Sequence, residues 1–154
     1  MLVIILNEVK KVIYEHAHKT YPQECCGFLY GTEHPDRTII LSKPVDNTQK
    51  NEKERRYQIS SLDYIKAEQF AIQNNLALLG VYHSHPDHPA MPSDFDTQHA
   101  LPFFSYLIVS IVNKEAKEMN SWRLNDERKF VEEILVSKQK TIPQITLNQE
   151  VHYG

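Results

Sequence analysis

Residues 76–86 have the sequence LALLGVYHSHP. Up to Tyr82 the run is apolar and only Gly80 interrupts it, which is typical of a β-strand covered on both faces. Such a strand needs a layer of structure above it and another below it. The stretch therefore predicts a central, mixed β-sheet flanked by helices, with two histidines at the end of one strand.

Two amphipathic helices are predicted outside this strand. Over residues 7–19 apolar side chains recur at spacings of three and four, and Pro22 prevents continuation. A second helix is expected to begin at Ser60 or Ser61 and to end at residues 74–75. Its apolar stripe is predicted to comprise Leu62, Ile65 and Ile72, widened by Phe70 and Ala71.

Strand and turn patterns complete the expected sheet. Polar turns are predicted at 33–37, 113–120 and 125–129, and a short helix from Ser93 to Leu101. Residues 46–56 carry no apolar side chain and predict an exposed loop. Strands are expected at residues 25–30, 38–41, 103–112, 121–124 and 130–136, with a further one at 142–151.

Composition limits the class of protein. The chain has 154 residues, of which 41% are hydrophobic and 24% charged. These values predict a single α/β (α+β) domain, with a core at about 7–136 and a C-terminal extension at 137–154. The net charge of −3 argues against nucleic acid as a partner. The longest apolar run, residues 2–6, is too short to cross a bilayer and lacks the features of a signal peptide, so we expect no membrane partner and a cytoplasmic location.

His83, His85 and Asp96 form a candidate metal site. Side chains alternate along a strand, so two histidines two residues apart face the same side and can reach one ion. Asp96 follows His85 by eleven residues, across a loop long enough to fold back. Two histidines and one carboxylate leave a fourth tetrahedral position for water, as in catalytic zinc sites.

The same residues also permit an interpretation without metal. Ser93 followed three residues later by Asp96 resembles a helix-capping pair. A His-x-His pair can occur by chance, and the prolines at 86, 89 and 92 can serve only to shape a turn. Spacing alone leaves both interpretations open.

The full pattern resembles the signature of the JAMM (MPN+) metalloprotease family. His83-x-His85 is followed after seven residues by Ser93-x-x-Asp96, and residues 22–31 are similar to the upstream segment that supplies the family's glutamate, here Glu24. The resemblance spans roughly residues 7–135, most of the chain. It implies a cytidine-deaminase-like fold.

The resemblance also implies roles for these residues. One Zn²⁺ per chain would be held by His83, His85 and Asp96. Glu24 would be the general base, and Ser93 would donate a hydrogen bond to the oxyanion. Without the resemblance, the base stays open, because the sequence offers three other carboxylates for it, Glu33, Asp87 and Asp94.

Compact, stand-alone members of this family resemble enzymes that cut after a terminal Gly-Gly. The implied partner is therefore a ubiquitin-like or sulfur-carrier protein, whose tail of two glycines permits close backbone approach. The loop at 46–56 is a candidate surface for that partner.

Other functions compete with this one. Zinc nucleobase deaminases need His-x-Glu and Pro-Cys-x-x-Cys, and this sequence has neither. A related DNA-repair-associated group usually has Asn where Ser84 stands here, which disfavours it. Cys25 and Cys26 are better explained as small buried residues than as a nucleophile. A non-catalytic scaffold that binds metal structurally stays open.

Overall fold

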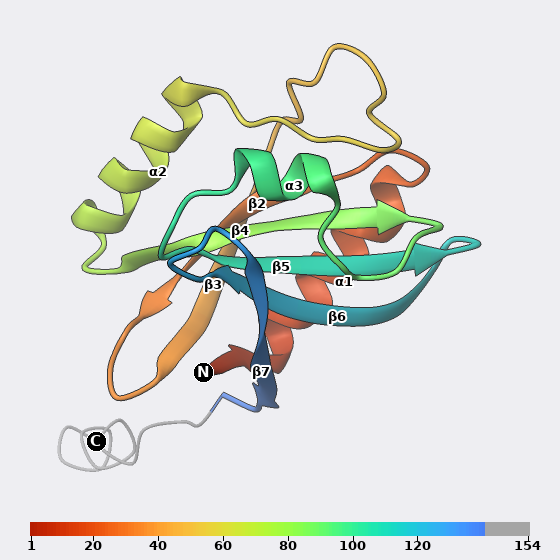
Figure 1. Ribbon diagram of the computed structural model, residues 1–154. Helices are drawn as coiled ribbons and strands as arrows, with labels where there is room; N and C mark the ends of the chain where they lie inside the picture. The colour runs from red at the N-terminus through yellow and green to blue at the C-terminus, as the bar shows by residue number, and fades with distance from the viewer. Residues whose placement is uncertain (141–154) are drawn as a thin grey trace, which may run out of the picture.

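The computed structural model describes residues 1–140, which form seven strands and three helices (Figure 1). No helix in this part of the chain is both long and apolar enough to span a membrane. The expected strand at 142–151 lies outside the described residues. The elements in chain order are β1 (Leu2–Leu6), α1 (Asn7–Thr20), β2 (Cys26–Thr32), β3 (Arg37–Val45), α2 (Ser61–Gln73), β4 (Ala77–Pro86), α3 (Asp94–His99), β5 (Ser105–Val112), β6 (Glu115–Leu124) and β7 (Phe130–Lys138).

The strands form one mixed sheet that closes on itself, in the order β1-β3-β2-β4-β5-β6-β7. Strand β1 closes it, because β1 pairs in parallel with both β3 and β7. The sequence predicts no strand at Leu2–Leu6 and starts the core at residue 7. In the structure Val3 and Ile5 of this strand are fully buried. The short apolar run is therefore part of the sheet.

Helices cover both faces of the sheet, as expected (Figure 1). Helix α1 packs on one face, where Val9, Ile13 and Ala17 are buried against Ile5, Leu29 and neighbouring strand residues. Helix α2 and the end of α3 cover the other face, where Ala67, Ala71 and Ala100 join a second buried cluster. Along β2, Phe28 and Tyr30 belong to the second cluster and Leu29 between them to the first. The sheet is thus covered on both faces, and the predicted α+β architecture is confirmed.

The stripe predicted for α2 is wrong at its three main positions, since Leu62, Ile65 and Ile72 are exposed. The two residues expected to widen it do face the core: Ala71 is buried beside Ala67, and Phe70 packs against the same cluster. The physical reason lies in the strands beneath it, because aromatic rings already fill the space there. Phe28 lies 5.3 Å from Tyr64 of the helix and Tyr30 lies 4.9 Å from Phe70, measured between ring centroids. Small alanines fit between these rings where larger apolar residues would not.

Strand β6 also differs from the prediction. It begins at Glu115, so most of the predicted turn at 113–120 is strand, antiparallel to β5. The polar residues that predicted a turn point away from the core, since 115–118 are exposed. Backbone pairing with β5 outweighs their low strand propensity.

The antiparallel pairing of β2 with β4 positions the candidate site. It places Cys26 opposite His83 and Gly27 opposite Tyr82. A Cβ atom at position 27 would lie 2.5 Å from the Tyr82 ring, so only glycine permits this approach. Glu24, two residues before Cys26, is thereby brought to the end of β4 that carries both histidines.

Candidate metal and catalytic site

The two histidines of β4 lie on the same face of the strand. Both are buried, and their Nε2 atoms are 3.1 Å apart. The alternation expected for a strand therefore holds at this position. The His83 ring also stacks on Tyr57, with ring centroids 4.4 Å apart. Tyr57 precedes α2 and restricts how the His83 ring can turn.

Helix α3 brings Asp96 to the histidines. Its Oδ2 atom lies 3.2 Å from His83 Nε2 and 3.1 Å from His85 Nε2. The same oxygen accepts the backbone N–H of Ser93, and Ser93 Oγ accepts the N–H of Asp96. The capping pair suggested by the sequence is therefore present. One carboxylate takes part in both the cap and the histidine cluster.

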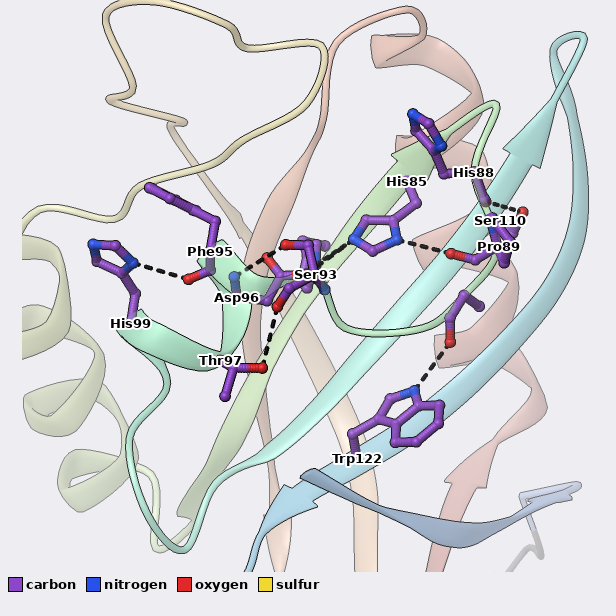
Figure 2. A network of polar contacts seen from close by, with 12 residues as sticks. His85, His88, Pro89, Ser93, Phe95, Asp96, Thr97, His99, Ser110 and Trp122 are labelled. Atoms are coloured by element: carbon purple, nitrogen blue, oxygen red, sulfur yellow. Dashed lines mark hydrogen bonds and ion pairs between the residues drawn. The ribbon is translucent and has the colours of Figure 1, made fainter. Parts of the chain in front are cut away.

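The loop after β4 sets which ring nitrogen of His85 carries its proton. Figure 2 shows His85 between Asp96 and Pro89. Its Nδ1 lies 2.8 Å from the carbonyl oxygen of Pro89, which can only accept a hydrogen bond. The proton of the neutral ring therefore sits on Nδ1, and Nε2 is left with a free lone pair. This is the form in which imidazole binds metals.

Glu24 lies beside the histidines just before β2. Its side chain is buried, and Oε1 has no hydrogen-bond partner among the described residues. Burial, together with the nearby negative charge of Asp96, raises the pKa of Glu24 to about 9. A buried carboxyl of this kind needs a nearby positive charge if it is to be ionised at neutral pH.

Burial and contacts shift the other two groups in opposite directions. Burial lowers the pKa of His83 and outweighs the attraction of Asp96, so the ring is held neutral. Burial alone would raise the pKa of Asp96. Interactions with His83 and His85 and the hydrogen bond from the Ser93 backbone N–H overcome it, and the pKa of Asp96 falls below its ordinary range.

The donor atoms fit a tetrahedral metal ion. Two imidazole nitrogens and one carboxylate oxygen form a triangle with edges of 3.1, 3.1 and 3.2 Å. Ligands about 2.0 Å from a tetrahedral zinc are separated by about 3.3 Å, close to these edges. Glu24 can also offer an oxygen within 4.8 Å of both histidine nitrogens, so the geometry allows a second donor set that replaces Asp96 with Glu24.

A cavity of about 400 Å³ lies over the histidine cluster. Its lining includes Glu24, His85 and Ser93, and on the loop side Arg55 and Arg56. The guanidinium of Arg56 lies 4.5 Å from the centre of the Phe95 ring, so the loop at 46–56 reaches across to α3. Most of this loop is exposed, as predicted, but it also forms one wall of the site.

The other candidate bases lie in different surroundings. Glu33 is held by Arg37, and Asp87 accepts hydrogen bonds from Tyr21 and from the backbone of Asn113. Asp94 lines the cavity but is exposed. Only Glu24 among the four is buried beside the histidines.

The cysteines do not have the properties of nucleophiles. Cys25 and Cys26 are both buried and free. Burial raises the pKa of the Cys25 thiol to about 11, so it stays protonated at neutral pH. Both residues contribute instead to the two buried clusters on either side of β2.

Three residues of the site have no assigned role in the sequence pattern. Ser84 points away from its neighbouring histidines, and its Oγ accepts the backbone N–H of Cys25 at 2.8 Å. Tyr57 and Pro89 contact the two imidazoles, as described above. A polar serine at the end of an apolar strand is a sequence signal that could have identified Ser84 as part of the site. No local pattern identifies Tyr57.

Glu24→Gln is expected to stabilise the metal-free protein at neutral and alkaline pH. The folded protein holds this carboxyl protonated up to a pKa of about 9, whereas the ordinary pKa of a glutamate carboxyl is 4.5. The folded state therefore binds more protons between these values, and wild-type stability falls as pH rises through them. The glutamine variant lacks this loss. Measured in the presence of a chelator, the melting temperature of Glu24→Gln should exceed that of wild type by an amount that grows as the pH rises.

Asp94→Asn is the control, because it removes an exposed carboxylate of the same cavity. It should not reproduce the divergence. Parallel pH profiles for wild type and Glu24→Gln would show that burial does not hold Glu24 protonated.

Several known proteins are similar to this chain over most of its length. A CysO-cysteine peptidase of Mycobacterium tuberculosis is 26% identical over 139 residues, which cover 90% of this chain and 93% of that protein. A desampylase of Pyrococcus furiosus is 27% identical over 109 residues, covering 71% of this chain and 72% of that protein. The solution structure of a protein from Desulfitobacterium hafniense matches with a TM-score of 0.78 at 25% identity, covering 90% of this chain and 94% of that one.

The family model described as prokaryotic homologues of the JAB domain matches residues 6–125. That range includes β4, α3 and every residue of the site described above. The chain therefore belongs to the prokaryotic homologues of the JAB domain and is a compact member of the JAMM/MPN family.

Proposed function

We propose that this protein is a zinc-dependent peptidase that cleaves after the C-terminal Gly-Gly of a ubiquitin-like or sulfur-carrier protein. The observation that carries the proposal is the convergence of His83, His85 and Asp96 within 3.2 Å of one another, beside the buried Glu24. Two imidazole nitrogens and a carboxylate oxygen at these distances are suited to a shared cation. The cytoplasmic location and the single-domain organisation stay predictions.

His83, His85 and Asp96 are the proposed ligands, one ion per chain. Asp96 contacts both imidazoles at hydrogen-bond distance, whereas Glu24 Oε1 has no such partner. A bound Zn²⁺ would supply Lewis acidity, lowering the pKa of a water and polarising the scissile carbonyl.

Glu24 is the proposed general base. Glu24 lines the cavity, and its buried Oε1 has no hydrogen-bond partner among the described residues, so the carboxyl has capacity left to bind a water there. It would accept a proton from the attacking water and later deliver it to the leaving amine. A carboxyl whose pKa is raised by burial is suited to both steps, because it binds and releases a proton near neutral pH once a cation is nearby.

Ser93 is the proposed oxyanion donor. Its Oγ accepts the N–H of Asp96, which leaves the hydroxyl hydrogen free to donate into the cavity. Capping and catalysis therefore use different parts of the same hydroxyl group. Its hydrogen bond would stabilise the transition state most, because negative charge develops on the carbonyl oxygen there.

The proposed substrate class is supported by the two curated relatives. One is named for peptidase action on CysO-cysteine and the other is a desampylase. The cavity has a volume of about 400 Å³ and Arg55 and Arg56 of the polar loop line it, which supports a site for a narrow tail of two glycines. The globular part of the carrier would then lie over the loop at 46–56.

Asp96→Asn and Glu24→Gln separate the two possible donor sets. Asparagine at 96 keeps an oxygen for the Ser93 N–H but loses the charge, so zinc content should fall strongly. Glu24→Gln should retain about one zinc per chain. Elemental analysis decides, with His99→Ala, an exposed histidine of the same helix, as the control. Zinc lost in Glu24→Gln but kept in Asp96→Asn would reverse the assignment.

Ser93→Ala and Ser60→Ala form a matched pair. Both serines cap a helix by accepting the N–H of the third residue, Asp96 and Asp63 respectively. Each substitution should cost about 1 kcal/mol of stability. Only Ser93→Ala should lower turnover, by roughly 10²-fold, because it removes the oxyanion donor. Equal activity of the two variants in steady-state assays would leave Ser93 with a capping role alone.

The substrate is tested with ubiquitin-like carriers fused to a short peptide through Gly-Gly or Ala-Ala. The Gly-Gly junction should be cut directly after the second glycine, because side chains at the junction would block close backbone approach. Glu24→Gln should be slower by roughly 10²–10⁴-fold while keeping its metal. Equal cutting of both junctions, or equal cutting of unstructured peptides, would exclude this substrate class.

A further inference from the structure

The backbone of Glu24 is held by the loop that follows β3. The N–H of Glu24 donates to the carbonyl oxygen of Lys53 at 2.7 Å. Its own carbonyl oxygen accepts a hydrogen bond from the Asn47 side chain at 3.3 Å. Both peptide groups of the proposed base are thus bound to one loop, which the sequence pattern suggests only as an exposed, polar connection.

Asn47 is the centre of that loop. Its Nδ2 donates to the carbonyl oxygens of Glu24 and Arg56, at 3.3 and 3.0 Å. Its Oδ1 accepts the backbone N–H groups of Gln49 and Gln58, both at 3.0 Å. One side chain therefore joins the start of the loop, the end of the loop and the backbone of Glu24.

These four contacts use the complete hydrogen-bonding capacity of an asparagine side chain, two donors and two acceptor sites. Aspartate has nearly the same shape but no donor when ionised. At position 47 it would direct negative oxygen at the carbonyls of Glu24 and Arg56, replacing two attractions with two repulsions. The arrangement therefore requires an amide and not merely a small polar residue.

Glu24 depends on these backbone contacts because its carboxyl has little else to hold it. Oε1 has no hydrogen-bond partner among the described residues. The next residue, Cys25, is fixed through its N–H by Ser84 Oγ. The direction of the Glu24 side chain is thus set by the peptide groups on either side of it.

We propose that Asn47 is a positioning residue that fixes Glu24 against the histidines. The inference rests on the proposed function, in which Glu24 is the base. Asn47 does not contact the cavity over the histidines. Its effect on catalysis passes through the backbone of Glu24. A misplacement of a reacting group by about 1 Å can cost roughly 10²-fold in rate.

Asn125 provides a matched control. It lies in the turn between β6 and β7, where its Oδ1 accepts the N–H groups of Glu127 and Lys129 at 3.0 and 2.9 Å. Its contacts use the acceptor oxygen, which aspartate retains. Asn125→Asp should therefore be tolerated, whereas Asn47→Asp should not.

The first measurement is steady-state kinetics on the Gly-Gly fusion with metal-loaded protein. Asn47→Asp should lower kcat by roughly 10–100-fold with KM changed less than about threefold, and with zinc content unchanged. Asn125→Asp should match wild type. A change confined to KM, or an equal loss in both variants, would overturn the positioning role.

The second measurement does not depend on activity. Amide hydrogen exchange of Glu24 reports its bond to Lys53, and Asn47→Asp should accelerate that exchange by roughly tenfold or more relative to Asn125→Asp. Unchanged exchange at Glu24 would overturn the inference even for an active enzyme. If wild type cuts no carrier fusion, the proposed function fails, and the exchange rates alone still decide whether Asn47 holds Glu24.

Discussion

The pairing of β2 with β4 is the constraint on which the rest of the site depends. Its register sets Cys26 opposite His83, so the chain just before β2 arrives beside the histidines. Gly27 allows the Tyr82 ring to lie against the strand, and Ser84 binds the N–H of Cys25. A shift of one residue would turn the histidines toward α1 and remove Glu24 from their side.

The site brings together two carboxyl groups that cannot both be ionised at low cost when no cation is present. Glu24 and Asp96 both lie close to the two imidazoles, and all four residues are buried. Burial raises the pKa of Glu24, and the pKa of Asp96 falls because the histidines and the Ser93 N–H surround it. Such an arrangement costs stability in the metal-free protein, as functional sites commonly do.

Backbone contacts, more than side-chain contacts, hold the reactive groups in place. Lys53 and Asn47 bind the peptide groups of Glu24, and Pro89 binds His85 through its carbonyl oxygen. Helix α3 is only six residues long, and its capping pair directs Asp96 to the histidines. The capping interpretation and the metal interpretation of this pair are therefore compatible, since one oxygen takes part in both.

Local patterns in the sequence by themselves determined the helix at 7–20, the apolar strand ending in His83 and His85, and the cap formed by Ser93 and Asp96. Each of these features depends on neighbours within a few residues, so periodicity and spacing in the sequence are enough to predict it. Tertiary structure decided the closure of the sheet by β1, the buried face of α2, the burial of Glu24 beside the histidines and the contacts of Asn47. These depend on which distant segments pair and how much volume their side chains already fill, and no local pattern records either quantity.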